Sequence, residues 1–194
     1  PLASSMNKNG LDNRSREKKV GLWVGGVSTF LLVSFFLVPF YLPEGSVPKL
    51  SGRANAFDYH SEDGWGNIQT SGNGDVGHNQ SEYGEFVWSD LDPYAAFIYG
   101  FGDLNCHTKA ERSWEVNGNQ MPVCVRDVGI FLGIAIGGFL FSRKGFNRWT
   151  IRDTVLSLLP DRVMGPVYKN DKRLLAMFVI CLLYTSDAAD DDTR

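Results

Sequence analysis

Apolar residues are gathered into a few long runs, and polar or turn-forming residues fill the segments between them. The longest run, residues 20–42, contains no charged side chain. As an α-helix it would reach about 34 Å at a rise of ~1.5 Å per residue, enough to cross a hydrocarbon core of ~30 Å. It is therefore predicted to be the first transmembrane helix. A cleaved signal peptide is the alternative, but the apolar part of a signal peptide is only ~7–15 residues long.

A second apolar run, residues 128–142, is predicted to be transmembrane helix 2. The run alone is short for a span, but the helix can start near Pro122, because proline suits the first turn of a helix. Three glycines recur every four residues and share one helix face: Gly129, Gly133 and Gly137. Small residues in this pattern are typical of helices that pack closely in membranes. A glycine-rich helix in the core of a soluble protein is the alternative.

A third apolar run starts at Leu174, and residues 174–185 are expected to be the start of a truncated third transmembrane helix. Residues 181–194 resemble a translated sequencing adapter joined in frame to the gene, so they are set aside. The natural protein is therefore expected to be longer and to have at least three spans.

The segments between these runs have their own patterns. Residues 43–93 are rich in glycine, serine, asparagine and aspartate and show no sustained helical or strand period, which predicts a flexible acidic insert. Residues 94–127 are expected to form a Cys/His loop at the membrane surface, where the aromatic run 93–104 suits an interfacial helix or a re-entrant cap. Residues 143–173 are basic and predicted to be amphipathic, although a plain helical connector fits equally well. The predicted fold class is all-α, an integral membrane helical bundle.

Charge is distributed unevenly along the chain. Residues 1–19 carry five Lys and Arg and residues 143–173 carry eight, whereas residues 43–127 carry five against thirteen Asp and Glu. The positive-inside rule therefore predicts a cytoplasmic basic N-terminal tail and an extracytoplasmic segment 43–120 in a cell membrane. The formal net charge of -3 gives no reason to expect nucleic acid as a partner. The expected partners are the lipid bilayer and either another copy of the chain or other membrane helices.

The side chains best suited to bind a metal or to react lie just before the second predicted span. The candidate site comprises Cys106, His107, Cys124 and Asp127. A disulfide between the two cysteines would contribute ~3 kcal/mol outside the cytoplasm. The four side chains also offer ligand atoms for zinc, but adjacent Cys and His rarely bind one ion and the C-x2-C spacing is missing. A reactive thiol beside Arg126, or a pair of inert buried thiols, completes the alternatives.

Residues 101–141 resemble a known family of membrane proteins. The resemblance rests on a Cys-His pair, a Glu-Arg-Ser triplet and a Gln-x-Pro-x-Cys-x-Arg-Asp motif that leads into a glycine-rich helix. The matching positions are Cys106, His107, Glu111, Arg112, Ser113, Gln120, Pro122, Cys124, Arg126, Gly129, Ile130 and Gly133. The family is domain of unknown function 2085, and the resemblance implies a small multi-pass membrane protein without an assigned activity. Thr108, Val128 and Phe131 depart from the usual pattern, and Asp127 stands where some members have a cysteine, which argues against an all-cysteine metal site.

Four residues of this segment are predicted to position the loop: Glu111, Arg112, Gln120 and Arg126. Glu111 and Arg112 are expected to pair with Arg126 and Asp127 at the membrane surface, where isolated pairs contribute ~0–1 kcal/mol. The CH…CxRD motif is interpreted as a structural clasp or assembly element of an integral membrane protein. A metal-binding or thiol redox enzyme at the membrane surface and a small-solute transporter subunit are the alternatives. An enzyme is the less favoured class, because no phosphate loop, nucleophile elbow or HExxH helix is present.

Overall fold

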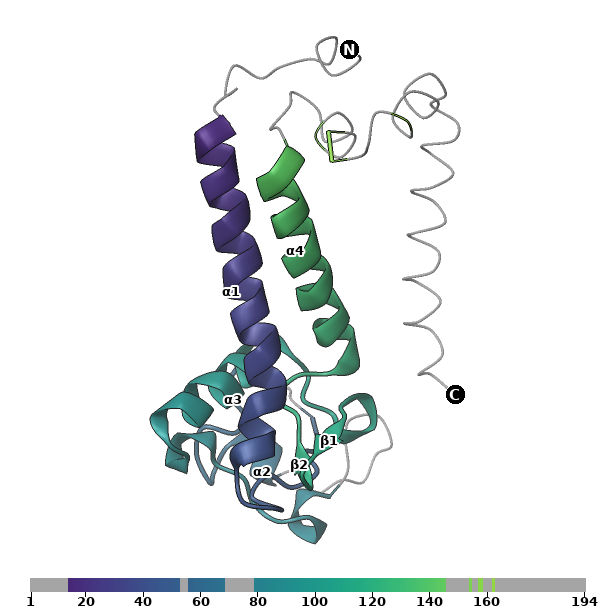
Figure 1. Cartoon of the computed structure of the whole chain (residues 1–194). Helices are drawn as coiled ribbons and strands as arrows, with labels where there is room; N and C mark the ends of the chain where they lie inside the picture. Colours follow the sequence, from purple (N-terminus) through teal and green to yellow (C-terminus); the bar gives the residue numbers. More distant parts are fainter. Residues whose placement is uncertain are drawn as a thin grey trace. The chain divides into compact units, whose positions relative to one another are not determined.

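The structure is a computed structural model that describes residues 14–52, 56–68, 79–145, 154, 157–158 and 162. It is mostly helical (Figure 1). The longer helices are α1 (Arg14–Tyr41), α3 (Pro93–Asn105) and α4 (Val125–Lys144), and α2 is a short helix (Trp65–Ile68). Strands β1 (Glu115–Val116) and β2 (Asn119–Gln120) form an antiparallel hairpin. Single helical turns cover Gln80–Glu82, Trp88–Asp90 and Ala110–Arg112. The chain divides into two compact units, and the features below lie in the unit Trp23–Gly138.

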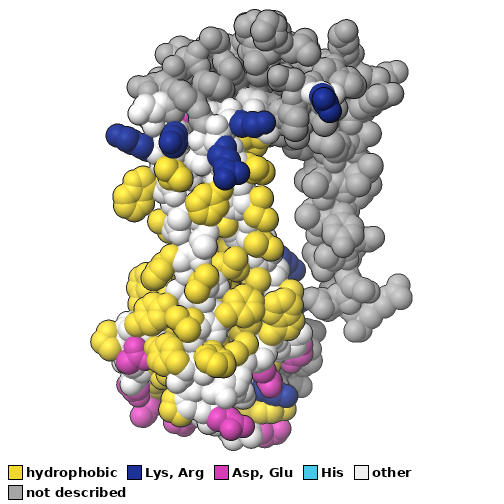
Figure 2. Space-filling model, in the orientation of Figure 1, with side chains coloured by type: hydrophobic (Ala, Val, Ile, Leu, Met, Phe, Trp, Pro, Cys, Tyr) yellow, Lys and Arg dark blue, Asp and Glu magenta, His cyan; other side chains and the backbone are white. Residues whose placement is uncertain are grey.

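Two helices of the described chain are long and apolar enough to cross a membrane. They cover Ser15–Tyr41 and Val125–Lys144, with a mean hydropathy of 2.0 and 1.6 in their most apolar windows. Only 33% of the first window and 22% of the second are buried within the structure. Figure 2 shows exposed hydrophobic side chains gathered along α1. Since the core helix of a soluble protein buries most of its apolar surface, these helices need another apolar environment.

Helix α4 begins later than the earliest start that its sequence allowed. Pro122 is buried in a bend before the helix, and the first helical residue is Val125. Arg126 and Asp127 therefore lie in the first turn of α4, where the negative carboxylate is favoured by the positive end of the helix dipole. Its 20 residues give α4 a length of about 30 Å, which matches a hydrocarbon core.

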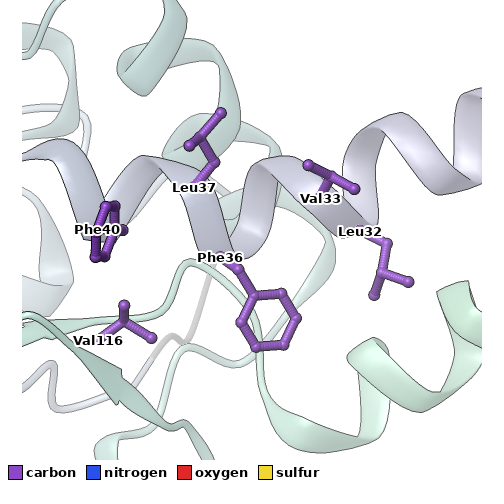
Figure 3. Close-up of a pocket in the computed structure, with 6 residues that line it drawn as sticks. All are labelled: Leu32, Val33, Phe36, Leu37, Phe40 and Val116. Carbon is purple, nitrogen blue, oxygen red and sulfur yellow. The ribbon is translucent and has the colours of Figure 1, made fainter.

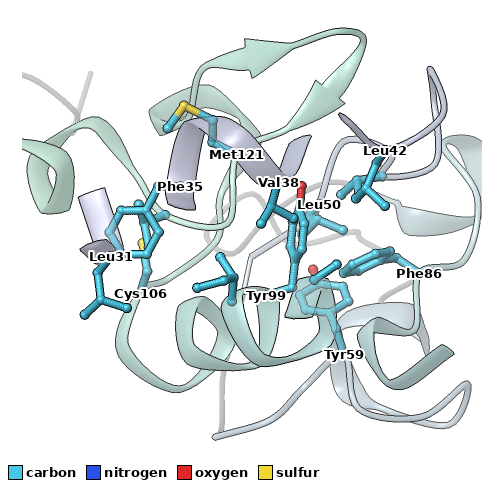
Figure 4. Packing of buried hydrophobic residues seen from close by; sticks show 14 of the residues in the cluster. Leu31, Phe35, Val38, Leu42, Leu50, Tyr59, Phe86, Tyr99, Cys106 and Met121 are labelled. Atoms are coloured by element: carbon cyan, nitrogen blue, oxygen red, sulfur yellow. The ribbon is translucent and has the colours of Figure 1, made fainter. Parts of the chain in front are cut away.

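The hydrophobic core lies where the C-terminal half of α1 meets α3 and the segments that flank the hairpin. Helix α1 contributes Phe35 and Val38, both fully buried, and α3 contributes Ile98 and Tyr99. Figure 4 shows side chains from these separate segments pointing toward one another. Burying a side chain of this size stabilises the fold by about 1.5–3 kcal/mol. The last turns of α1 are thus part of a folded domain as well as of a membrane span.

The described residues between 42 and 124 form this domain, which we call the head domain. Its described residues include most of the segment predicted to be a flexible insert, and they pack into the core. Val47, Leu50, Tyr59 and Phe86 are each 4% exposed or less. Such isolated apolar residues in a polar sequence produce no periodic pattern, so the prediction missed their contribution. In the described ranges 43–52, 56–68 and 79–93 the chain is packed, not an unstructured insert.

Buried amide side chains replace regular secondary structure in the head domain. The Gln80 amide accepts a bond from the Ser51 N–H and donates to the Lys49 and Gly84 carbonyls, over 2.8, 3.0 and 2.8 Å. The Asn67 amide accepts from the Phe86 N–H and donates to the Phe86 and Ser61 carbonyls. Buried backbone groups cost free energy unless they are paired, and here side chains supply the partners.

The Asn119 side chain likewise supplies hydrogen-bond partners for backbone groups at the end of α1. Its Oδ1 accepts the Val47 N–H over 2.9 Å, and its Nδ2 donates to the Pro39 and Pro43 carbonyls over 3.0 and 3.1 Å. The Leu42 carbonyl is a further acceptor at 3.4 Å. Because the last carbonyls of a helix have no intrahelical partner, this amide caps α1 and joins it to the hairpin.

Gly129, Gly133 and Gly137 lie on α4, but the close packing predicted for them is not made within the described residues. A Cβ built at each of these glycines would meet nothing within 4 Å. The predictions for residues 1–13, for 174–185 and 181–194, and for nearly all of 146–173 lie outside the described residues.

Candidate functional site

Cys106 ends helix α3 and turns its side chain into the core. Its N–H donates to the Gly102 carbonyl over 2.7 Å, and its side chain is 2% exposed. Two residues later Thr108 adopts a left-handed conformation with φ of 48°, which turns the chain back on itself. The Thr108 N–H donates to the Cys106 sulfur, so the turn is closed around the thiol.

Cys124 occupies the position just before α4. Its carbonyl accepts the N–H of Val128 over 3.1 Å, which makes Cys124 the N-cap residue of the helix. Its Sγ accepts the Asp127 N–H, and the thiol donates to Asp127 Oδ2 over 3.3 Å. This reciprocal pair resembles a capping box, in which the N-cap side chain and the third helical residue satisfy each other.

The backbone N–H of Cys124 donates to the sulfur of Cys106 over 3.2 Å. This bond joins the end of α3 directly to the start of α4. Gly102 makes the approach possible, because a Cβ at this position would overlap the Pro122 carbonyl oxygen. The Tyr99 hydroxyl adds a 2.7 Å bond to the Gln120 carbonyl, so the strand that leads to Cys124 is held against α3 at two places.

Gln120 lies behind this junction and is 1% exposed. Its Oε1 accepts the Leu50 N–H over 2.7 Å, and its Nε2 donates to the Thr108 carbonyl over 2.9 Å. The side chain therefore connects the turn after Cys106 to a distant segment of the head domain. This geometry gives a physical reason for a glutamine in the Gln-x-Pro-x-Cys motif.

Three of the four predicted site residues come together. The Cys106 and Cys124 sulfurs and a carboxylate oxygen of Asp127 all lie within 4.8 Å of one another. His107 is exposed and is not part of this group among the described residues. The backbone of Cys106 is extended, with φ of -117° and ψ of 158°, and successive side chains of an extended chain point in opposite directions.

The two thiols, both free in the structure, have different acidities. The pKa of Cys124 falls to about 7, mainly because the Cys106 thiol donates a hydrogen bond that stabilises the Cys124 thiolate. The same hydrogen bond, together with burial, raises the pKa of Cys106. A pair of this kind shares one proton near neutral pH, with the negative charge on the more accessible sulfur at the start of α4.

The remaining predicted residues are not members of this group among the described residues. Glu111 and Arg112 lie in the single turn Ala110–Arg112, and Arg126 is exposed in the first turn of α4. The ion pairs expected among these residues and Asp127 stay a prediction.

Sequence reasoning missed Gly102, Tyr99 and Asn119, although one local signal was present. Asn117 and Gly118 both have positive φ, 54° and 70°, and connect β1 to β2 as a two-residue hairpin turn. An Asn-Gly pair is a strong signal for such a turn. Recognising it would have placed Asn119 and Gln120 on a strand next to the thiol pair.

The segment that begins at Cys106 and runs through α4 can be compared with known families. Residues 106–165 match the family described as predicted membrane protein (DUF2085). The resemblance seen in the sequence is confirmed for these residues. The DUF2085 match and the two apolar helices together identify the chain as a membrane protein that lies in the lipid bilayer. No curated protein and no solved structure matches the chain.

The DUF2085 segment includes both cysteines, Asp127 and all of α4, whereas α1 and most of the head domain precede it. The thiol pair is therefore a feature of the matched segment. Its surroundings are built by residues from outside that segment, such as Leu50 and Tyr99.

Proposed function

We propose that this membrane protein carries its head domain on the extracytoplasmic side and that Cys106 and Cys124 form a clasp between this domain and α4. The contact between the Cys106 sulfur and the Cys124 N–H supports the proposal, because it joins the C-cap residue of α3 to the residue that caps a membrane span. The clasp is a structural element, and it would hold the head domain at a constant position relative to the start of α4.

Charge supports the orientation. Residues 1–19, which include the first turns of α1, carry five Lys and Arg, and the segment 43–127 carries thirteen Asp and Glu. A basic tail is retained in the cytoplasm, which places the C-terminal end of α1 and the start of α4 outside. The cysteines would then lie in an oxidising compartment, where disulfides form and persist.

Oxidation of the clasp follows the chemistry of thiol–disulfide exchange. The Cys124 thiolate attacks one sulfur of an external disulfide oxidant and displaces the other as a thiolate. The Cys106 thiol then loses its proton and attacks the Cys124 sulfur of the mixed disulfide. The products are the Cys106–Cys124 disulfide and a fully reduced oxidant that has accepted two electrons. The cross-link would stabilise the folded chain by ~3 kcal/mol.

Zinc binding is the second candidate, and Asp127 favours it. Two sulfurs and one carboxylate within 4.8 Å supply three ligands, which leaves one position of a tetrahedral site open for water. Both sulfurs also accept backbone N–H groups, an arrangement that stabilises thiolates. Under this alternative the clasp would be closed by the ion rather than by a covalent bond.

One set of measurements separates these states. Intact cells that express the full chain are treated with a membrane-impermeant maleimide, with and without prior reduction, and the purified protein is analysed by intact mass and by metal content. For a disulfide clasp we expect labelling only after reduction, no bound zinc, and lower thermal stability in Cys106→Ser and Cys124→Ser.

Stoichiometric zinc that is lost in Asp127→Asn would support the metal alternative and exclude the disulfide. Free thiols without zinc, together with unchanged stability of both serine variants, would contradict the clasp. Labelling that requires cell lysis would contradict the orientation, independently of the state of the cysteines.

A further inference from the structure

A groove runs along α1 beside the hairpin, and we call it the α1–β1 groove. Its volume is about 510 Å³. Figure 3 shows that five of its six lining side chains come from α1 and that the sixth, Val116, comes from β1. The lining residues are Leu32, Val33, Phe36, Leu37, Phe40 and Val116. None of these side chains carries a nitrogen or oxygen atom, so a polar ligand would find no side-chain partner there.

The two walls of the groove are held in place by polar contacts outside it. The Asn117 amide donates to the Phe40 and Leu42 carbonyls over 3.3 and 3.0 Å. The Asn119 amide binds the Pro39 carbonyl on the same turn of α1. The hairpin is therefore locked to the end of the helix, and the groove is a preformed feature rather than a chance gap between side chains.

The position of the groove matches one leaflet of a bilayer. From Leu32 to Phe40, α1 rises about 12 Å, and one leaflet contributes about 15 Å of hydrocarbon. Val33 and Phe40 are 54% and 66% exposed, so the groove is continuous with the surface that α1 presents to lipid. Trp114, 49% exposed, lies beside Phe36 with ring centroids 6.2 Å apart. Trp114 therefore adds an exposed aromatic ring to the apolar surface beside the middle of the groove.

We propose that the α1–β1 groove binds one acyl chain of a lipid in the leaflet next to the head domain. The level of the groove within one leaflet, its apolar lining and its continuity with the lipid-facing surface of α1 all favour an acyl chain over a polar molecule. The acyl chain would lie parallel to α1, with the lipid headgroup at the Phe40 end of the groove, next to the head domain.

The proposal can be tested with phosphatidylcholine that carries a photoactivatable diazirine on one acyl chain. The full chain is reconstituted into phosphatidylcholine vesicles, irradiated and digested, and cross-linked residues are mapped by mass spectrometry. Val116→Trp fills the groove from the hairpin side. Val27→Trp is the matched control, because Val27 is an exposed residue of α1 that does not line the groove.

We expect groove residues to cross-link at least about fivefold more than Phe30 or other exposed residues of α1, a preference of ~1 kcal/mol. Val116→Trp should abolish this preference and Val27→Trp should leave it unchanged. Unchanged alkylation rates of Cys106 and Cys124 would show that a variant has kept its fold, and Leu37→Trp replaces Val116→Trp if it has not.

Equal cross-linking along the exposed face of α1 would overturn the proposal, since it would mean ordinary contact with bulk lipid. Protection of the groove by a second copy of the chain, or by another of its helices, would overturn it as well. Neither result depends on the state of the cysteines.

Discussion

Replacing Gln120 by leucine should weaken the head domain and release the turn that surrounds Cys106. The substitution preserves side-chain size but leaves the Leu50 N–H and the Thr108 carbonyl without the partners they have at 2.7 and 2.9 Å. Each unpaired buried group costs about 1–3 kcal/mol, and the apolar side chain recovers about 1–2 kcal/mol. We therefore expect the free energy of unfolding to fall by about 1–4 kcal/mol.

The assay compares the full chain with its variant by chemical denaturation in detergent micelles. Alkylation rates of Cys106 and Cys124 are measured in parallel under native conditions after reduction. Gln80→Leu is the matched control, because Gln80 is an equally buried amide that bonds Ser51, Lys49 and Gly84 and does not contact the cysteine turn. It should cost similar stability but leave both alkylation rates unchanged.

Only Gln120→Leu should speed the alkylation of Cys106, because only this variant frees the Thr108 carbonyl and the turn closed around the thiol. A stability loss below ~0.5 kcal/mol, which is ordinary for a surface substitution, would refute the hydrogen-bond argument. Equal changes in the alkylation rates of the two variants would refute the specific link between Gln120 and the thiol pair.

Three further outcomes follow from the same structure. Alkylation of Cys124 in the reduced protein should be half-maximal near pH 7, its lowered pKa, and Cys106→Ala, which cannot donate a hydrogen bond to the Cys124 thiolate, should move that midpoint toward the ordinary pKa of 9.0; an unshifted midpoint would contradict the shared proton. Gly102→Ala should lower the free energy of unfolding by about 1–3 kcal/mol, because the added Cβ collides with Pro122. Gly129→Ala is the control: its Cβ meets nothing within 4 Å, so it should change the free energy of unfolding by no more than ~0.5 kcal/mol. Equal effects of the two variants in denaturation would contradict the close approach at Gly102. Burial raises the pKa of Tyr59 from 10.0 to about 12, so the neutral phenol favours the folded state. This contribution of roughly 3 kcal/mol is complete below pH 10 and is lost as the pH rises to 12, and the loss should disappear from the pH dependence of unfolding in Tyr59→Phe.

The membrane spans could be predicted from the sequence because their signal is local. A long uncharged run such as residues 20–42 is expected to form a membrane-spanning helix, and α1 covers nearly all of it. The start of helix α4 could be predicted only to within a few residues: Pro122 suits a first helical turn, but it lies in a bend and the helix begins at Val125. The head domain lacks any such signal. Its core uses single residues such as Tyr59, and its backbone bonds end on buried amides such as Asn119, which composition alone assigns to exposed turns.

The candidate site could be predicted only in part, because some of its contacts are local in the sequence and others depend on tertiary packing. The sequence named Cys106 and His107 as candidates for one site although adjacent Cys and His rarely bind one ion, and in the structure the extended backbone at Cys106 sends their side chains in opposite directions. Cys124 and Asp127 lie close together because residues three apart are neighbours at the start of a helix. The contact of Cys124 with Cys106 depends on Gly102 and Tyr99, whose roles emerge only when α3 packs against the segment before α4.

The double role of α1 has a practical consequence for dissecting this molecule. Phe35 and Val38 belong to the membrane span and also lie at the centre of the head-domain core, and the Asn119 amide seals the end of the same helix. Cutting the chain after Leu42 would not give a water-soluble head domain, because it would remove the α1 side chains that form one side of the head-domain core. Anchor and head therefore have to be produced, purified and studied as one piece.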